Sequence, residues 1–266
     1  MAAYERAQFL RASLAKGPIV GPFCKTCDPA VIEALGLGGF DFVILDMEHG
    51  PSGLETIGGL IRAAEVAQVA PIVRVRSCND ELIGMVLDLG AAGVQVPQIR
   101  SPEDLSGAKK KVRFSPEGER GVCKYVRAAG YSSIAPSEYF ASGDRPLLIA
   151  QVEASQAIEN LDKILDVGGL DILFIGPYDL SQSLGVTGQV AHPSVVSAMK
   201  KVVDACLVRR VAAGVFVDDT EAARHWASVG VKYICLSVDM GIIVQGSRHM
   251  LNCVHNNLDI TEPNLR

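Results

Sequence analysis

Short apolar runs alternate with amphipathic helical patterns along almost the whole chain, and this alternation constrains the fold more than any other feature. A continuous apolar run is typical of a parallel strand that is buried on both faces. Helical segments between such runs indicate β–α–β units, in which successive strands lie parallel. The predicted strands are residues 18–23, 41–46, 71–75, 93–96, 147–152, 170–175, 211–217 and 233–237. The clearest predicted helices are residues 3–16, 54–67, 81–89, 155–166, 193–209 and 220–229.

Eight such units in about 250 residues predict an α/β fold of the (β/α)8 or TIM-barrel type. A doubly wound open sheet is the alternative, but no GxGxxG motif follows the first predicted strand, and the even spacing favours closure. We expect residues 1–266 to form a single domain, because no linker interrupts the pattern and the length suits one large core. The main interruption is a glycine-containing segment at about 113–146. We expect it to be a long loop with short helical pieces, acting as a lid or an interface.

Composition and charge argue against several classes of function. The net charge is −5 and there is no basic cluster, which argues against nucleic-acid binding. No apolar run approaches the roughly 20 residues of a membrane-spanning helix, and the N-terminus lacks a signal-peptide pattern. The seven cysteines are odd in number and scattered, which is typical of reduced thiols in the cytoplasm. Cys24 and Cys27 form a CxxC, but a single such motif is a weak indication of a redox or zinc site. We therefore expect a cytoplasmic protein without nucleic-acid or membrane partners.

Polar side chains occur at the carboxyl ends of five consecutive predicted strands, from the second to the sixth. In a barrel these ends meet at one face, and that face carries the active site. The sequence therefore predicts an active site there. The polar residues in question are Asp46, Glu48, His49, Arg74, Gln98, Gln151, Glu153 and Asp179.

The segment from Asp46 to Gly50 contains the most concentrated chemistry. Asp46 and Glu48 are two residues apart and share one face if the strand geometry continues, and His49 follows in a loop. Carboxylates beside an imidazole at the end of a buried strand indicate proton transfer. The alternative is a helix N-terminus at which the acids only cap backbone N–H groups.

Glu153 and Asp179 follow adjacent predicted strands, so their carboxylates can converge on one ion. Two hard oxygen ligands leave several octahedral positions free, which suits Mg²⁺ or Mn²⁺ shared with a chelating substrate. Taken singly, each residue is better explained as a helix cap, whereas the pair beside Arg74 and His49 favours a metal site. Arg74 ends an apolar strand and needs an anion, which is either the substrate or a structural partner.

Together these residues predict the chemistry of an enolate. A divalent cation would chelate the carboxylate and carbonyl of a 2-oxo acid, and Arg74 would help to neutralise the charge that develops on the carbonyl oxygen. His49, oriented by Asp46, would move a proton. We find no lysine at a matching strand end, which argues against Schiff-base catalysis.

Five motifs occur in order along the chain, namely Asp46-x-Glu48-His49-Gly50, Val73-Arg74-Val75, Gly118-x-Arg120-Gly121-Val122, Gln151-Val152-Glu153 and Gly176-Pro177-x-Asp179-Leu180-Ser181. With these motifs the chain resembles the HpcH/HpaI aldolase family, over roughly residues 5–250. The family consists of metal-dependent class II pyruvate aldolases of the 2-dehydro-3-deoxyglucarate aldolase and 4-hydroxy-2-oxoheptanedioate aldolase types. The resemblance implies a lyase that reversibly cleaves a 4-hydroxy-2-oxo acid, such as a 2-keto-3-deoxy sugar acid, to pyruvate and an aldehyde.

The resemblance also implies roles for individual residues. Glu153 and Asp179 would bind Mg²⁺, Mn²⁺ or Co²⁺, and Arg74 would contact the substrate oxo group. His49 would act as the acid–base catalyst with Asp46, and Asp88 would contribute to a neighbouring site. Gln151 and the acceptor-loop residue Arg127 would contact the substrate. The N–H groups of Tyr178 and Asp179 would bind the pyruvate carboxylate. The family further implies a last helix that swaps between subunits, and a homo-hexamer built as a trimer of dimers.

The chain departs from the family pattern at two places. Tyr178 stands where the family usually has a small residue, and the 122–127 loop keeps an arginine in altered surroundings. Two other functions were weighed. An acyl-CoA lyase of the citrate-lyase branch is the alternative enzyme, and the absence of a clear basic patch for the CoA phosphates argues only weakly against it. A non-catalytic barrel retained for binding would be favoured by loss of His49, Glu153 or Asp179, and none is lost.

Overall fold

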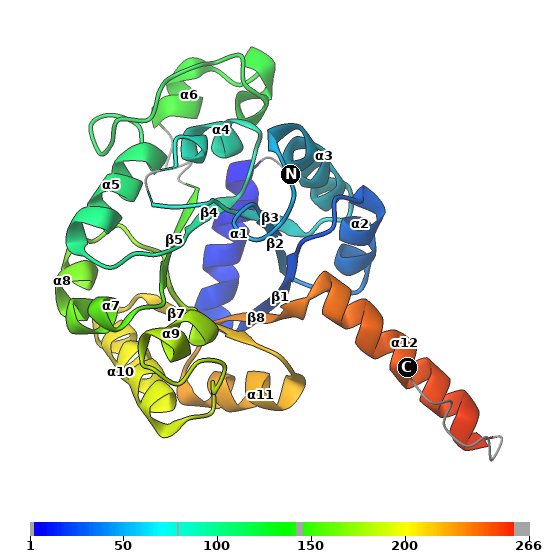
Figure 1. The fold of residues 1–266 in the computed structure, drawn as a ribbon. Helices are drawn as coiled ribbons and strands as arrows, with labels where there is room; N and C mark the ends of the chain where they lie inside the picture. Colours follow the sequence, from blue (N-terminus) through cyan, green and yellow to red (C-terminus); the bar gives the residue numbers. More distant parts are fainter. Residues whose placement is uncertain (1–2, 79, 142–145, 258–266) are drawn as a thin grey trace.

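A computed structural model describes residues 3–78, 80–141 and 146–257 and contains a closed barrel of eight parallel strands. Each strand pairs with the next in sequence, and the last pairs with the first, so the predicted (β/α)8 barrel is confirmed (Figure 1). The strands are β1 (Ile19–Cys24), β2 (Phe42–Asp46), β3 (Ala70–Arg74), β4 (Gly93–Val96), β5 (Leu147–Val152), β6 (Ile172–Ile175), β7 (Ala212–Val217) and β8 (Tyr233–Val238).

Most helices surround the barrel and cover its outer face, whereas the first helix crosses one end of the barrel and the last extends away from it (Figure 1). They are α1 (Ala3–Lys16), α2 (Pro29–Leu37), α3 (Leu54–Val66), α4 (Leu82–Asp88), α5 (Pro102–Val112), α6 (Pro136–Ala141), α7 (Ser155–Glu159), α8 (Leu161–Asp166), α9 (Pro177–Ser183), α10 (Pro193–Arg209), α11 (Thr220–Val229) and α12 (Asp239–Asn257), with a 3₁₀ segment η1 (Arg127–Ser132). One predicted helix, 155–166, is two helices. They divide at Asn160, whose side-chain amide donates a hydrogen bond to the carbonyl of Arg100 at 3.0 Å. No described helix is long and apolar enough to cross a lipid bilayer.

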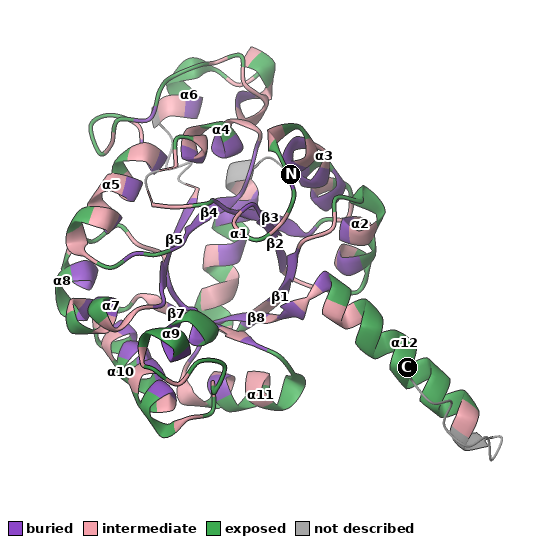
Figure 2. Ribbon diagram, viewed as in Figure 1, coloured by how far each residue is buried: buried purple, intermediate pink, exposed green. Residues whose placement is uncertain are grey.

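Two separate hydrophobic cores follow from the alternation of side chains along each strand. The outer core fills the space between the strands and the surrounding helices. The inner core fills the barrel, and α1 closes its lower end with Ala7 and Leu10. In Figure 2 the strands form a buried ring, with α1 crossing behind it.

The inward-facing side chains are apolar in the middle of the strands and polar at their carboxyl ends. On β2, Phe42 and Ile44 belong to the inner core and Asp46 is the next residue on that face. On β7, Phe216 packs against the inner core and Asp218 follows it. The barrel is therefore apolar inside and polar at its carboxyl end, which positions the site described below.

The described part of the predicted 113–146 loop packs against α4 and α5. Phe114 makes edge contacts with the rings of Tyr139 and Phe140, at centroid distances of 5.7 and 5.2 Å. Arg120 lies over the Phe114 ring and binds Asp88 at the end of α4, at 2.5 Å. This segment is therefore packed as well as long, and residues 142–145 lie outside the described residues.

Candidate functional site

Two neighbouring cavities open at the carboxyl end of the barrel. The first, of about 280 Å³, is lined by His49, Arg74, Gln151, Tyr178 and Asp179 together with aromatic and backbone groups, and we call it the central cavity. The second, of about 410 Å³, shares His49 and Asp179 with it and is also lined by Glu48, Gln98 and Glu153. We call this the side cavity. The structure thus brings most of the predicted site residues together at one face.

Arg74, at the end of β3, is held by carboxylates of the neighbouring strand. Its Nε and Nη2 donate to the two oxygens of Asp46 at 2.8 and 2.7 Å, and its Nη1 lies 3.1 Å from Glu48 Oε2. Burial opposes the charge of the guanidinium, but the hydrogen bonds and charge of Asp46, followed by Glu48, raise the pKa of Arg74 above its usual value. The anion that Arg74 requires is therefore supplied by the protein, while the residue also lines the central cavity.

Asp46 also fixes the loop that carries His49. Its Oδ1 accepts hydrogen bonds from the backbone N–H groups of Glu48 at 3.0 Å and His49 at 3.3 Å. We expected Asp46 to orient His49. The hydrogen bond between them runs through the backbone of His49, and the Asp46 side chain pairs with Arg74. Gly50 is required in this turn, since a Cβ there would lie 2.2 Å from the carbonyl oxygen of Asp46. The His49 side chain faces both cavities.

Three carboxylates gather at the side cavity. The oxygens of Glu153 accept hydrogen bonds from the Gln151 side chain at 2.5 Å and from the Gln98 backbone at 2.8 Å. Burial, with the charges of Glu48 and Asp179, raises the pKa of Glu153 to about 7 in spite of those two hydrogen bonds. Burial likewise raises the pKa of Glu48, although Arg74 and Gln98 oppose the shift.

The carboxylates of Glu48, Glu153 and Asp179 repel one another, and a bound cation would reduce this repulsion. The donors are carboxylate oxygens, the ligands that Mg²⁺ and Mn²⁺ prefer. Among residues 3–78, 80–141 and 146–257, no three or more His, Cys, Asp or Glu side chains are grouped so as to hold a metal ion. Glu153 and Asp179, whose charges interact, have the donor chemistry for a cation that binds two protein carboxylates and leaves its further positions to other molecules.

Gln95 belongs to the site although the sequence analysis did not identify it. Its Nε2 donates to Gln151 Oε1 at 2.6 Å, and Gln151 in turn donates to Glu153. Gln95 is fully buried, and its own oxygen has no hydrogen-bond partner in the described part of the chain. The sequence shows only a polar residue, Gln95, between Val94 and Val96, and its inward-facing position follows from the pairing of β4 in the closed barrel.

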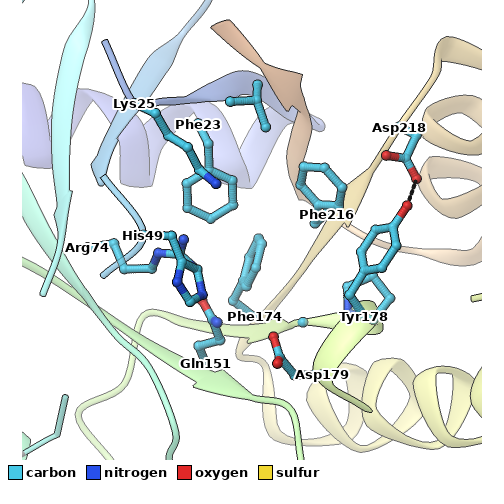
Figure 3. A pocket seen from close by; sticks show the side chains of 13 residues that line it. Phe23, Lys25, His49, Arg74, Gln151, Phe174, Tyr178, Asp179, Phe216 and Asp218 are labelled. Atoms are coloured by element: carbon cyan, nitrogen blue, oxygen red, sulfur yellow. Dashed lines mark hydrogen bonds between the residues drawn. The ribbon is translucent and has the colours of Figure 1, made fainter. Parts of the chain in front are cut away.

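Two more residues at the cavity come from strands whose ends we did not consider. Lys25 follows β1 and Asp218 follows β7, and both line the central cavity (Figure 3). The statement that no lysine lies at a matching strand end was therefore wrong. Asp239, which is 1 % exposed, accepts hydrogen bonds from the backbone N–H groups of Lys25 and Thr26 at 3.0 and 2.9 Å and so fixes this loop.

The family model for HpcH/HpaI aldolase/citrate lyase matches residues 20–245. The chain belongs to this family. It is 32% identical over 246 residues to a hydroxypyruvate/pyruvate aldolase of Paraburkholderia phytofirmans, covering 90% of this chain and 94% of that protein. It is 30% identical over 236 residues to a 5-keto-4-deoxy-D-glucarate aldolase of Escherichia coli O6:H1, covering 88% and 91% of the two chains.

A solved structure shows the same relationship. An HpcH/HpaI aldolase/citrate lyase family protein from Burkholderia cenocepacia superposes with a TM-score of 0.87 at 33% identity, over 94% of this chain and 98% of that one. The relatives are named as aldolases, and aldolases are carbon–carbon lyases. This member of the HpcH/HpaI family is therefore an enzyme of the lyase class.

Two residues for which the family implies roles lie away from both cavities of this chain. Asp88 accepts a hydrogen bond from Arg120 at 2.5 Å on the outer side of the barrel. Arg127 forms an ion pair with Glu65 and donates to the carbonyl of Leu89 at 3.1 Å. Neither residue reaches the cavities of its own chain, so roles at a neighbouring subunit's site and at the acceptor aldehyde stay predictions.

The CxxC segment does not form a cysteine pair. Cys24 is buried and Cys27 is exposed with its sulfur 3.4 Å from Ser52 Oγ. All seven cysteines are free thiols. Residues 24–27 are thus the end of β1 followed by a loop.

Proposed function

We propose that this member of the HpcH/HpaI family is a divalent-metal-dependent pyruvate aldolase. It cleaves a 4-hydroxy-2-oxo acid of the 2-keto-3-deoxy sugar acid type, reversibly, to pyruvate and an aldehyde. The observation that carries the proposal is that a guanidinium group, an imidazole and two carboxylates line two adjoining cavities. These groups are Arg74, His49, Glu153 and Asp179.

Glu153 and Asp179 would hold the cation, which we expect to be Mg²⁺, Mn²⁺ or Co²⁺. When bound, it supplies Lewis acidity that polarises the 2-oxo group of the substrate. The residues around these ligands limit how they move. Gln95 and Gln151 fix one oxygen of Glu153, and the backbone of Gln98 fixes the other.

Arg74 and His49 divide the remaining chemistry. In the cleavage direction, His49 takes the proton of the C4 hydroxyl group. The C3–C4 bond then breaks, its electron pair forms the enolate of pyruvate, and the C4 fragment leaves as the aldehyde. Arg74 faces the enolate oxygen with a charge that the pair with Asp46 keeps in place. Protonation at C3 completes pyruvate.

The substrate carboxylate would bind where α9 begins. The first N–H groups of a helix have no partner within it and favour an anion. Pro177 occupies the first position of α9, so the N–H groups of Tyr178 and Asp179 are available at the rim of the central cavity. Gln151 lies beside them and would contact the same substrate.

The proposal is tested by screening 2-keto-3-deoxy sugar acids for pyruvate release. The enzyme is treated with EDTA and then assayed with and without Mg²⁺, Mn²⁺ and Co²⁺. We expect release only with a metal, and loss of release in Glu153→Ala and Asp179→Ala proteins that keep the far-UV spectrum of the barrel. Undiminished turnover after EDTA would contradict the proposal.

Lys25 makes a second test necessary. Because this lysine lines the central cavity, a Schiff base with pyruvate is the competing mechanism. Borohydride in the presence of pyruvate would trap such an adduct on Lys25, and mass spectrometry would detect it. We expect no adduct.

We also propose that the enzyme is a cytoplasmic homo-oligomer, a hexamer built as a trimer of dimers in which α12 swaps between subunits. The free thiols suit a reducing compartment. The helix α12 extends away from its own barrel (Figure 1). It leaves a series of apolar side chains exposed, namely Met240, Ile243, Val244, Met250, Leu251 and Val254.

A further inference from the structure

A third cavity, of about 320 Å³, lies at the amino end of the barrel, on the face opposite to the proposed reaction. It is lined by the residues that directly precede three strands, namely Asp171 before β6, Val211 before β7 and Lys232 before β8. The helix α1, which crosses behind the barrel in Figure 2, also lines it. We call this the lower cavity, and no step of the proposed reaction uses it.

Positive charge predominates at the lower cavity, although the whole chain has a net charge of −5. Arg11, Arg210 and Lys232 line it, and Asp171 is the one acidic residue among the described residues that do. The two carboxylate oxygens of Asp171 accept hydrogen bonds from Arg11 at 2.7 and 3.1 Å, and Arg113 lies 3.6 Å from one of them. The acidic residue is therefore already neutralised, and the cavity keeps an excess of positive charge.

Two of the cationic side chains lack a partner. Within residues 3–78, 80–141 and 146–257, the side chains of Arg210 and Lys232 form no hydrogen bond and no ion pair. They come from different segments, the end of α10 and the start of β8, and both line the same cavity. Much of the remaining lining is apolar and includes Leu14 and Leu207. A ligand that matches this surface has separate anionic groups joined by a short hydrocarbon chain.

The backbone of Arg210 indicates that its side chain is needed there. Arg210 follows the last residue of α10 with φ 56°, in the left-handed region that costs energy in any residue with a Cβ. The helix α11 ends at the same cavity with a left-handed residue, and there the residue is Gly230. The alternative is that Arg210 only balances the carbonyl end of α10. However, Arg209 already occupies the last turn, and Lys232 belongs to no helix.

We propose that the lower cavity is a binding site for a small organic acid with two or more carboxylate groups. Arg210 and Lys232 bind its carboxylates, and Leu14 and Leu207 contact the carbon chain between them. The site lies on the opposite face from the central cavity, so the inference does not depend on the proposed aldolase function.

The test uses tricarballylate as the probe, in isothermal titration calorimetry with the metal-free full-length protein. We expect binding that excess pyruvate does not displace, and weaker binding of inorganic phosphate, which has no carbon chain. Lys232→Gln should raise the Kd for tricarballylate by about tenfold, the usual effect of losing a hydrogen bond to a charged group. Arg210→Gly should raise the Kd to a similar extent and also raise the Tm of the ligand-free protein, because glycine adopts the left-handed region without a Cβ.

Lys200→Gln is the matched control. It removes the same charge from an exposed position on α10 that does not line the lower cavity, so the Kd should not change. The inference is overturned if the wild type binds no tricarballylate, if pyruvate displaces it, or if phosphate binds more tightly. It is equally overturned if Lys200→Gln weakens binding as much as Lys232→Gln does. A lower Tm with an unchanged Kd in Arg210→Gly would show that Arg210 has only a structural role, which also overturns it.

Discussion

At the scale of single residues, one carboxylate organises the proposed reaction centre. Asp46 and Arg74 are register partners on β2 and β3, so their bidentate contact follows from strand pairing. The same carboxylate anchors the backbone of the loop that carries His49. A buried arginine that lost this partner would be left facing Glu48 alone, and the imidazole would lose its fixed position. Asp46 therefore couples the two residues to which we assign separate chemical roles.

Those roles predict different kinetic defects. Arg74→Lys should reduce kcat by about a hundredfold in both aldol cleavage and oxaloacetate decarboxylation, because a planar fork is replaced by a point charge at a site of developing charge. His49→Ala should reduce aldol cleavage by about a hundredfold or more while sparing decarboxylation, which requires no proton removal from a hydroxyl group. Both rates are measured in each variant. Equal loss of both activities in His49→Ala, with neither lost in Arg74→Lys, would show that the roles are wrongly assigned.

Glu153 predicts a dependence of stability on pH in the metal-free protein. In the folded state its pKa is raised from 4.5 to about 7, so between these values the folded state binds more protons than the unfolded chain. The free energy of unfolding therefore falls as pH rises from 4.5 to about 7. Above pH 7 the ionisation of Glu153 causes no further fall. The Glu153→Gln variant has no carboxyl group at this position, so its stability does not fall in this way. In EDTA its Tm should exceed that of the wild type by more at pH 8 than at pH 5, as calorimetry can measure. An advantage of equal size at both values would contradict the shifted pKa.

At the scale of elements, the sequence predicted what depends on local periodicity. β4 and β5 have the predicted bounds, and the other strands differ by one or two residues. Gln95 was missed because burial on the inward face is decided by barrel closure rather than by neighbouring residues. Lys25 and Asp218 were missed because each is the first residue after its strand. The alternation of inward-facing and outward-facing side chains continues past the end of the strand and turns both side chains inward. The pairing of Asp46 with Arg74 needed the strand register, which no single segment specifies.

The long segment after α5 should behave as an ordered element. The backbone N–H groups of Glu119, Arg120 and Tyr131 donate to carbonyls at 2.7, 3.0 and 3.0 Å, and the aromatic cluster at Phe114 packs beside them. Hydrogen exchange followed by mass spectrometry should therefore show slow exchange at these positions in the assembled protein. Rapid exchange throughout the segment would contradict a packed role.

At the scale of the whole molecule, α12 is a helix whose apolar side chains its own chain leaves exposed. Exposed apolar residues recur along it at helical spacing. A contiguous apolar surface of this kind usually marks a contact with another protein. This agrees with the proposed swap of the last helix between subunits.

Leu251→Asp should weaken that assembly. The variant places a charge where we propose an apolar contact, so its mass measured by light scattering should fall below that of the wild type at equal concentration. Asn252→Asp is the control, since it adds the same charge to the next residue of α12, which is already polar, and its mass should not change. If both variants keep the mass of the wild type, the proposed role of α12 in assembly is wrong.

The closure of the lower barrel by α1 has a consequence for the order in which the protein is made. The helix is synthesised before all eight strands, yet Arg11 within it binds Asp171 before β6, and the strand that follows it pairs with β8 through Ile19 and Tyr233. On the ribosome, α1 can reach its final position only after these later strands have been synthesised. Contacts so distant in sequence make folding slow. Until β8 emerges, the apolar residues of α1 have no interior to enter, and we expect the nascent chain to depend on chaperones during that interval.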